Sequence, residues 1–479
     1  MNILFVSSEV VPFAKTGGLA DVIGALPEAL AKKGHTCGII LPFYSMVKKN
    51  GFAPKVFKKG LTVKINGKNE IFNLLLLKQG NIDVYFIEKD EYYNRDQLYG
   101  TPQGDYPDNA FRFGFFAKAV IAAVADIGSQ DILHCNDWQS ALIPLYVKLS
   151  HKDDPLFNKT KILFTIHNMA YQGIFSREVM LDLGLEEDLF TPDLLEFYGK
   201  LNFMKAGIIY SDAVSTVSKG YSREILTPEF SAGLDGLLRT REKDLYGIVN
   251  GVDYSIWNPS TDKFIAANYS EKGLAGKEEC KKDILKECGI KYNPKRPLIG
   301  MITRFAEQKG IDLVAQGMAN IIKMGCDFVI LGFGDEKYNN IFSKLNVKHR
   351  GHMAALIKFD NSLAHKIEAG SDMFLMPSRY EPCGLNQLYS LKYATVPIVR
   401  AVGGLEDTVE NFDIAAKKGN GFKFKDASCR ELLNTVKTAV AVFKNKAVWN
   451  TLLKNCLACD YSWDSSAEQY EKLYDRLLA

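Results

Sequence analysis

Three cations follow directly on apolar runs of the sequence. Lys15 lies in KTGGLADV, shortly after ILFVSS, and Arg304 and Lys309 lie in TRFAEQKG, directly after LIGMI. An arginine offers phosphate oxygens a rigid fork of donors, and a lysine offers a point charge. Together the three could neutralise a diphosphate without a metal. On spacing alone, ordinary surface cations explain them equally well, so other segments must decide.

Two glycine-rich loops follow apolar runs and precede helix-patterned segments. Gly17 and Gly18 stand before LADVIGALPEAL, and Gly403 and Gly404 stand in VGGLEDTV. A helix start offers free N–H groups and a partial positive charge to an anion. The sequence contains neither the P-loop pattern nor the GxGxxG fingerprint. The alternative for the loop of Gly17 and Gly18 is a glycine turn that permits close packing, with a solvated lysine beside it.

The segment PSRYEPCGLNQLY adds a carboxylate to a third such loop. Glu381 follows a strand-like run, and Gly384 and Leu385 open a helix-like one. A carboxylate at this place suits sugar hydroxyls better than phosphates. His167 in FTIHNMAYQG and Asp137 in HCNDWQS also end apolar runs, although a lone histidine is more often a structural residue. Three glycine loops at strand ends favour a binding site over coincidence.

Short apolar runs alternate with helix-patterned segments in two series, which predicts two parallel sheets covered by helices. The first series is ILFVSS, CGIILPF, IDVYFIE, DILHCND, KILFTIHN and DAVSTVS, and the second is LYGIVNG, PLIGMITRF, DFVILGFG, SDMFLMPS, VPIVRAVGG and GFKF. We place the boundary within residues 241–260. Ligands of such sheets bind beyond the carboxyl ends of the strands, where the motifs above lie.

Composition excludes several classes of protein. The 479 residues carry a net charge of only +3, without the clustered basic stripe that nucleic-acid binders show. Nine scattered cysteines form no disulfide framework, which indicates a reducing cytosol, and Cys456 and Cys459 are interpreted as packing residues. No apolar run approaches the length of a membrane span, and ILFVSSEVV lacks the features of a signal peptide. We therefore expect a cytoplasmic protein with no nucleic-acid or membrane partner.

The motifs KTGGLADV, HNMAYQG, NGVD, TRFAEQKG, PSRYEPCGLNQLY and GGLEDTV, taken in order, resemble the bacterial glycogen synthase and plant starch synthase family. The resemblance covers essentially the whole chain. It implies a GT-B fold of class α/β, with two doubly wound Rossmann-like domains facing each other across a deep cleft that closes on the donor. The acceptor-side domain would span residues 1–243 and be joined by a C-terminal helix at 460–479, and the nucleotide-sugar domain would span 247–459.

The resemblance also implies the reaction. Members of the family are retaining transferases that move glucose from ADP-glucose to the non-reducing end of an α-1,4-glucan such as glycogen or starch, without a metal or other cofactor. We infer attack on the face that the diphosphate leaves, because the sequence offers no obvious pair of catalytic carboxylates. Tyr389 stands where related transferases often carry a second glutamate, and glycogen and starch synthases share that tyrosine. The oligomeric state stays open.

The resemblance also implies a role for each matching site residue of this sequence. The catalytic set implied is Lys15, His167, Arg304, Lys309 and Glu381. The nucleotide-sugar set is Gly17, Gly18, Asn250, Phe359, Cys383, Gly384, Leu385, Gly403 and Gly404, with Phe359 against the adenine. The acceptor set is Asp21, Tyr99 and Asp137. Two alternatives within enzymes remain, a related transferase that prefers UDP-glucose and a sugar-nucleotide epimerase with another donor. A third is a non-catalytic glucan-binding protein on the same fold, against which the intact charged residues argue.

Overall fold

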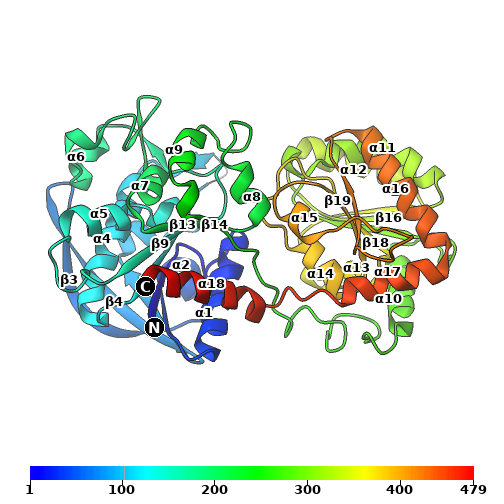
Figure 1. Cartoon of the computed structure of the whole chain (residues 1–479), viewed down its shortest axis with the longest axis horizontal. Coiled ribbons are helices and arrows are strands. Elements are labelled where there is room, and N and C mark those ends of the chain that lie inside the picture. The colour runs from blue at the N-terminus through cyan, green and yellow to red at the C-terminus, as the bar shows by residue number, and fades with distance from the viewer. Residues whose placement is uncertain (102) are drawn as a thin grey trace. The chain divides into compact units, whose positions relative to one another are not determined.

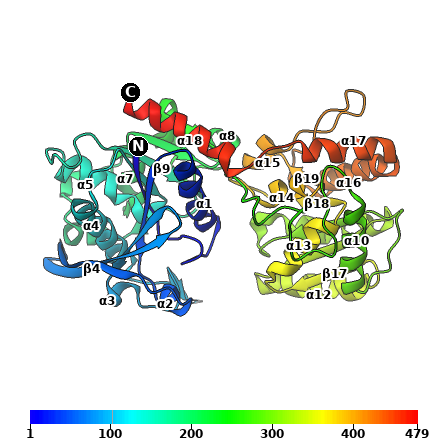
Figure 2. The same ribbon diagram turned by 90° about the horizontal axis from the view of Figure 1, so that it is seen from below.

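The computed structural model of the chain describes residues 1–101 and 103–479. The chain divides into two compact units. The first consists of residues 1–217, 222–251 and 463–479, and the second of residues 218–221 and 252–462. Each unit contains a mostly parallel sheet with helices on both of its faces (Figures 1 and 2).

The sheet of the first unit has nine strands in the described part of the chain. Their order is β14 (Leu245–Gly247), β13 (Ala213–Thr216), β9 (Lys161–Ile166), β8 (Ile132–Asn136), β1 (Asn2–Val6), β2 (Thr36–Pro42), β5 (Ile82–Glu88), β4 (Lys68–Gln79) and β3 (Lys55–Ile65). All pairs from β14 to β5 are parallel, and β4 and β3 are antiparallel additions. Phe5 pairs with Ile39 on one side and His134 on the other, so the strand order reverses at β1 and its neighbour β8.

The central strands of this sheet are buried on both faces, as continuous apolar runs predict for parallel strands. The helices of the unit are α1 (Gly18–Lys32), α2 (Ser45–Lys49), α3 (Asp90–Tyr93), α4 (Asn109–Ile127), α5 (Leu142–Ser150), α6 (Val179–Leu183), α7 (Phe203–Tyr210), α9 (Asp235–Thr240) and α18 (Trp463–Leu478), and α8 (Lys219–Glu224) has residues in both units. Short 3-10 turns are η1 (Trp138–Ser140), η2 (Glu187–Leu189) and η3 (Glu242–Asp244). Two small antiparallel sheets complete the unit: β10 (Ile174–Phe175), β12 (Lys200–Asn202) and β11 (Glu196–Phe197), and β6 (Gly100–Thr101) with β7 (Gly104–Asp105).

The C-terminal helix α18 is part of the first unit, where buried polar contacts hold it. The hydroxyl of Tyr474 lies 2.8 Å from Nδ1 of His134, and Nε2 of the same imidazole lies 2.6 Å from the Thr165 hydroxyl. Ser466 on the same helix donates to the carbonyl of Val249 at 2.8 Å. Helix α18 therefore anchors β8 through His134 and holds the segment that leads to Asn250.

The sheet of the second unit is entirely parallel. Its order is β17 (Met353–Ile357), β16 (Asp327–Gly332), β15 (Leu298–Ile302), β18 (Met373–Met376), β19 (Val396–Arg400) and β20 (Phe422–Phe424). Its helices are α10 (Ala275–Glu287), α11 (Ile311–Lys323), α12 (Glu336–Lys348), α13 (Asn361–Gly370), α14 (Asn386–Lys392), α15 (Gly403–Thr408), α16 (Cys429–Lys444) and α17 (Lys446–Leu457), with the 3-10 turn η4 (Glu307–Lys309). The order reverses between β15 and β18, which carry the predicted phosphate and sugar loops.

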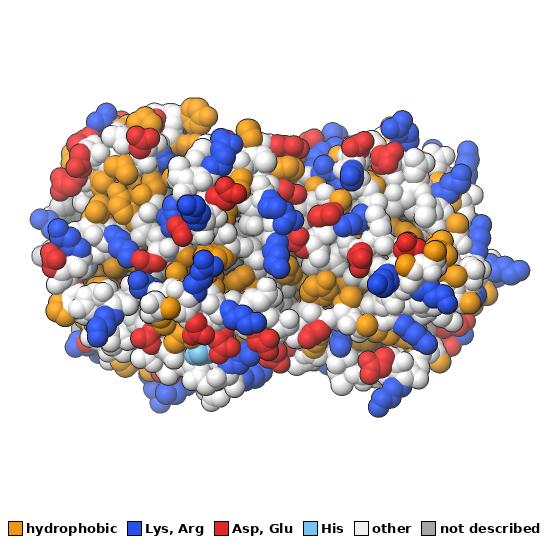
Figure 3. Space-filling model, in the orientation of Figure 1, with side chains coloured by type: hydrophobic (Ala, Val, Ile, Leu, Met, Phe, Trp, Pro, Cys, Tyr) orange, Lys and Arg blue, Asp and Glu red, His pale blue; other side chains and the backbone are white. Residues whose placement is uncertain are grey.

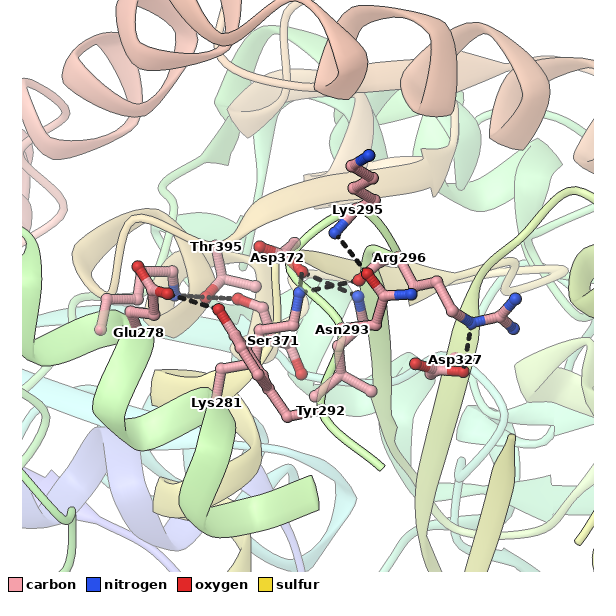
Figure 4. A network of polar contacts seen from close by, with 12 residues as sticks. Glu278, Lys281, Tyr292, Asn293, Lys295, Arg296, Asp327, Ser371, Asp372 and Thr395 are labelled. Atoms are coloured by element: carbon pink, nitrogen blue, oxygen red, sulfur yellow. Dashed lines mark hydrogen bonds and ion pairs between the residues drawn. The ribbon is translucent and has the colours of Figure 1, made fainter. Parts of the chain in front are cut away.

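A polar network fixes the amino ends of three of these strands (Figure 4). Oδ2 of Asp372 accepts hydrogen bonds at 2.7 Å from the N–H of Leu298, where β15 begins, and from Nζ of Lys281 on α10. Asp327, at the start of β16, accepts from Nε of Arg296 at 2.9 Å. Because these charges hold the amino edge of the sheet, the opposite edge is free to carry loops that bind ligands.

The strands of both series are confirmed except for one assignment. LYGIVNG was predicted to begin the second series, but β14 within it pairs in parallel with β13 and therefore extends the first sheet. The structure accordingly divides the chain after Gly251 and again after Ser462, beyond the predicted limits at 243–247 and 459–460. No helix among the described residues is long and apolar enough to cross a membrane. Acidic and basic side chains are interspersed over the face drawn in Figure 3.

Candidate functional site

In the first unit, a buried glutamate organises the loop between β1 and α1. The carboxylate of Glu9 accepts from the N–H of Gly17 at 2.9 Å and from the N–H and hydroxyl of Thr16. The hydroxyl of Tyr99 donates to its other oxygen at 2.8 Å. Glu9 therefore joins the predicted phosphate loop to the predicted acceptor residue Tyr99. No motif of the sequence had pointed to this glutamate.

Gly17 and Gly18 are not required for packing inside the protein. A Cβ at either position would meet no protein atom within 4 Å, and neither residue has a positive φ. Gly17 precedes α1, whose first N–H groups have no partner within the helix. The N–H of Gly17 is engaged by Glu9, so this group is not free for an anion as the sequence predicted. The open space above both glycines leaves room for a ligand at this helix start.

Lys15 is neutralised within its own loop. Its ammonium group lies 2.6 Å and 2.8 Å from the two carboxylate oxygens of Asp21 in the first turn of α1. Both side chains are exposed enough for water to screen the pair, so its contribution to stability is about 0–1 kcal/mol. A phosphate could displace this carboxylate at low cost. The structure thus brings together two residues that the sequence assigned to different substrates.

The ends of β8 and β9 hold Asp137 and His167 side by side. Oδ1 of Asp137 accepts from the N–H of His167 at 2.7 Å, and Nε2 of His167 lies 2.9 Å from Oδ1 of Asn136. The Asn136 amide donates to the carbonyls of Val6 and His134, so its Oδ1 accepts and the imidazole carries its proton on Nε2. The sequence analysis missed Asn136, which sets this tautomer.

Burial changes the protonation of both groups. Desolvation raises the pKa of Asp137 to about 7 and lowers the pKa of His167 to about 3. The imidazole is therefore neutral across the physiological range. Asp137 also has φ +54, a conformation that a non-glycine residue rarely adopts. Backbone strain of this kind is often retained at functional sites.

Two further features of the first unit belong to the same edge of the sheet. Asn250, in the segment that follows β14, is buried, and its Oδ1 has no hydrogen-bond partner in the described part of the chain. A buried amide oxygen without a donor is costly unless a ligand or water supplies one. A cavity of about 400 Å³ lies beside the loop of Glu9, with Thr16, Tyr99 and Asp105 in its wall. Both features offer polar atoms to a bound molecule.

In the second unit, the loops after β15 and β18 meet in a charge pair. Nζ of Lys309 lies 2.6 Å from Oε2 of Glu381, and the hydroxyl of Ser378 donates to the same oxygen at 2.9 Å. No described residue donates to Oε1 of Glu381, which is free to accept from a ligand hydroxyl. The structure therefore brings these two predicted residues together and adds Ser378 to them.

Arg304 is exposed in the loop that follows β15. Its only described hydrogen bond is a long one, 3.4 Å, from Nη2 to Oε1 of Gln308, and no described carboxylate lies within ion-pair distance. Gln308 in turn donates to the carbonyl of Tyr380, next to Glu381, at 3.3 Å. Arg304 thus keeps its full charge at the carboxyl edge of the sheet, close in the chain to Lys309.

Gly403 and Gly404 serve packing in this structure. A Cβ at Gly403 would lie 2.1 Å from the carbonyl oxygen of Glu381, and one at Gly404 would lie 2.0 Å from that of Cys383. The N–H of Gly404 donates to the carbonyls of Glu381 and Pro382. The prediction that this loop offers its N–H groups to an anion is therefore wrong for Gly404. Its glycines hold the loop that carries Glu381.

The remaining predicted residues of the second unit differ in exposure. Cys383 is buried, and Gly384, which has φ +72, and Leu385 lead from it into α14. Phe359 follows β17 and is 84% exposed, an unusual exposure for a phenylalanine unless something stacks on it.

The ring of Tyr389 packs within the second unit. Its ring stacks on Trp257 with 4.0 Å between centroids and an interplanar angle of 3°. The other face of Trp257 stacks on His365 at 3.9 Å. Tyr389 therefore fixes α14, immediately after the loop that carries Glu381. Among the described residues, no group of three or more His, Cys, Asp or Glu side chains could hold a metal ion.

Comparisons with known proteins agree with this arrangement. Residues 2–240 match the family described as the starch synthase catalytic domain, and residues 289–441 match glycosyl transferases group 1. The chain is 48% identical over 479 residues to a glycogen synthase of Koribacter versatilis, covering 99% of this chain and 98% of that protein. It is 47% identical to a glycogen synthase of Geotalea uraniireducens, covering 100% and 99%.

Solved structures give the same result. The catalytic domain of starch synthase IV from Arabidopsis thaliana has a TM-score of 0.90 and 33% identity, covering 100% of this chain and 99% of that one. A sucrose-phosphate synthase from Thermosynechococcus elongatus has a TM-score of 0.61 at 17% identity, covering 99% and 98%, and supports the fold alone. The two parallel-sheet units and their strand-end loops thus define a glycosyltransferase of the GT-B fold. Within that class, the chain belongs to the glycogen synthase and starch synthase family.

Proposed function

We propose that this glycosyltransferase transfers glucose from ADP-glucose to the non-reducing end of an α-1,4-glucan, with retention of configuration. The observation that carries the proposal is the pair Lys309–Glu381, with a free oxygen on Glu381, beside the unpaired charge of Arg304. A cation next to a hydroxyl acceptor suits a sugar linked to a diphosphate. The solved starch synthase IV was bound to ADP and acarbose, which supports an adenosine donor and a sugar acceptor.

Departure of the nucleoside diphosphate leaves negative charge on the phosphate oxygens. We assign Arg304 and Lys309 to that charge, with Lys15 as a third cation after release from Asp21. Preorganised charges that meet a developing charge lower the barrier most effectively, because they need no reorganisation during the reaction. The open space above Gly17 and Gly18 would let phosphate oxygens approach the first N–H groups of α1.

The carboxylates of the site are engaged in ways that do not suit a nucleophile. Oδ1 of Asp137 accepts from the backbone of His167, and Oε2 of Glu381 accepts from Lys309 and Ser378. We therefore assign Glu381 to a hydroxyl of the donor sugar and Asp137 to the acceptor. The acceptor hydroxyl would attack on the face that the diphosphate leaves and give its proton to the departing phosphate. A covalent glucosyl-enzyme trapped on either carboxylate would overturn this assignment.

The remaining assignments concern recognition. The exposed ring of Phe359 would stack on the adenine, Asn250 would hydrogen-bond the donor sugar through its unpartnered oxygen, and Tyr99 would line the acceptor side. The proposal includes no metal, because the three cations take the role of charge neutralisation. It also places the enzyme in the cytoplasm, since all nine cysteines are free thiols, as in a reducing compartment.

One assay tests donor, acceptor and metal independence together. Nucleoside diphosphate release is measured from ADP-glucose and from UDP-glucose, with and without glycogen, in EDTA. Release from ADP-glucose that requires glycogen and survives EDTA is the expected result. A preference for UDP-glucose would contradict the assignment of ADP-glucose as the donor and would leave the type of reaction unchanged. Release without glycogen would contradict the assignment of a glucan as the acceptor. The absence of release from either donor would favour a non-catalytic glucan-binding protein.

A further inference from the structure

The hairpin between β11 and β12 has an unusual residue at its tip. Phe197 pairs with Lys200, so the loop consists of two residues, Tyr198 and Gly199. Both have positive φ, +49 and +77, as in a type I′ turn. Such turns strongly prefer Asn, Asp or Gly at the first of these positions, because an L-residue with a large side chain is strained there.

Packing does not compensate for this strain. The Tyr198 side chain is 83% exposed. Its described ring contact is an edge-to-face pair with Phe197, with 4.7 Å between centroids and an interplanar angle of 82°. That contact orients the ring and still leaves it largely open to solvent. A bulky aromatic residue that is both strained and exposed indicates a role outside the fold.

The hairpin tip is connected to a second exposed tyrosine. A Cβ at Gly233 would lie 2.9 Å from the Phe197 ring and 3.6 Å from the Tyr198 ring, so this glycine lets its loop pack against the hairpin. The preceding residue, Ala232, accepts a hydrogen bond at 3.0 Å from the side chain of Gln172. Tyr171, next to Gln172, is 56% exposed. Tyr198 and Gln172, the neighbour of Tyr171, therefore contact the same loop.

The same segment begins at the catalytic edge of the first sheet. Tyr171 follows the end of β9, and its N–H donates to the carbonyl of Asn168, next to His167. At Gly173, a Cβ would lie 2.5 Å from the ring of Trp138, the residue that follows Asp137. The segment that carries Tyr171 therefore packs, through Gly173, against Trp138, the neighbour of the proposed acceptor residue Asp137.

We propose that Tyr198 is a stacking platform for glucosyl units of the acceptor chain beyond its terminal residue. Aromatic rings offer rigid, amphipathic surfaces, and a pyranose presents a face of C–H groups that can lie flat on such a ring. A solitary ring next to charged Glu196 and Lys200 is too small a patch for a protein interface. The inference rests on the proposed function, because a glucan is the occupant only if it is the acceptor.

The variants Tyr198→Asn and Tyr198→Phe test the platform in the full-length chain. Asparagine is favoured in this turn, so Tyr198→Asn should fold at least as stably as the wild type, and Tyr198→Phe keeps the ring as a matched control. We expect Tyr198→Asn to weaken retardation in glycogen-containing gels and to raise KM for glycogen about 5–10-fold. KM for ADP-glucose and kcat at saturating glycogen should change less than 2-fold, and Tyr198→Phe should resemble the wild type.

The outcomes separate this inference from the proposed function. Unchanged glycogen binding in Tyr198→Asn would overturn the platform, as would a parallel loss of kcat and donor binding that marks a structural role. A loss in Tyr198→Phe equal to that in Tyr198→Asn would overturn stacking as the cause. Binding in gels needs no donor, so it tests the platform even if wild-type transfer from ADP-glucose, the test of the proposed function, were to fail.

Discussion

Nζ of Lys309 and Oε2 of Glu381 lie 2.6 Å apart, although the two residues are 72 positions apart in the chain. The contact joins the turn after β15 to the loop after β18, the two strands at which the order of the second sheet reverses. In the proposed function this contact sets the charge that binds phosphate beside a carboxylate that accepts from a sugar hydroxyl, as the switch point of an open parallel sheet allows. The expected effect of replacing Lys309 depends on this contact.

Replacing Lys309 with alanine should lower kcat by about 100-fold or more, because one preorganised charge on the leaving group is lost. Glu381 keeps its hydrogen bond from Ser378, so the loop should stay in place. Steady-state kinetics with glycogen in excess measures the effect. Lys282→Ala, which removes an exposed lysine of α10, is the matched control, and equal activity of the two variants would remove Lys309 from the site.

Arg304→Ala separates catalysis from stability. The side chain is exposed and has only one long described hydrogen bond, so the free energy of unfolding should change by less than about 0.5 kcal/mol. We expect kcat/KM for ADP-glucose to fall about 100-fold, and Arg304→Lys to recover only part of it, because lysine lacks the planar fork. Arg430→Ala on α16 serves as a control for the loss of an exposed arginine. Full activity of Arg304→Ala would refute the assignment.

Asp21→Asn decides between two roles for one carboxylate. If Asp21 mainly holds Lys15, its removal frees the lysine, and KM for ADP-glucose should fall about 2–5-fold, the range of an exposed ion pair. If it serves the acceptor, KM for glycogen should rise instead. We expect the first result, because both carboxylate oxygens contact Lys15. Glu28→Gln, which breaks an exposed pair with Lys32 on the same helix, is the control.

Much of the fold and part of the site could be predicted from the sequence. Parallel strands buried on both faces are continuous apolar runs, and so both main sheets were visible in the chain. The hairpin of β3 and β4 was missed because its strands are rich in lysine and partly exposed at the sheet edge. β14 was assigned to the wrong sheet, because a three-residue strand carries no sign of its partner.

The candidate site residues were chosen because they follow apolar runs, and this rule selected Lys15, Asp137, His167, Arg304 and Glu381. Glu9 obeys the same rule, but it stands inside SSEVV, which continues the apolar first run. Contacts between distant segments could not be predicted, since Lys309–Glu381 and Tyr99–Glu9 exist only once the sheets form. The N–H of Gly404 was misinterpreted because a glycine needed for close packing and one needed for an anion look alike in a sequence.

Burial is the main cause of the raised pKa of Asp137, which is about 7. This shift predicts that both the stability and the activity of the protein depend on pH. The unfolded carboxyl ionises near pH 3.8, so the folded state loses stability as pH rises from there to about 7. Asp137→Asn should therefore be more stable than the wild type by about 1–3 kcal/mol at pH 8 and similar to it at pH 4. The wild-type profile of kcat/KM should show an inflection near pH 7 that the variant lacks. Denaturant unfolding and initial rates measure the two effects, and an inflection retained in Asp137→Asn would belong to another group.

The buried imidazole of His134 predicts how the stability of the first unit falls at acid pH. Burial lowers the pKa of its imidazole to about 3, whereas an unfolded histidine binds a proton near pH 6.5. The unfolded state therefore gains protons first, and stability should fall as pH decreases from about 6.5 towards 3, by up to about 1.4 kcal/mol per pH unit for this group. His134→Gln removes the titrating group and should cost stability at pH 7, because the contacts with Tyr474 and Thr165 are weakened. The difference in unfolding free energy between variant and wild type should then shrink as pH falls from 7 to 5. A difference that stays constant over this range would show that His134 is not the group that titrates.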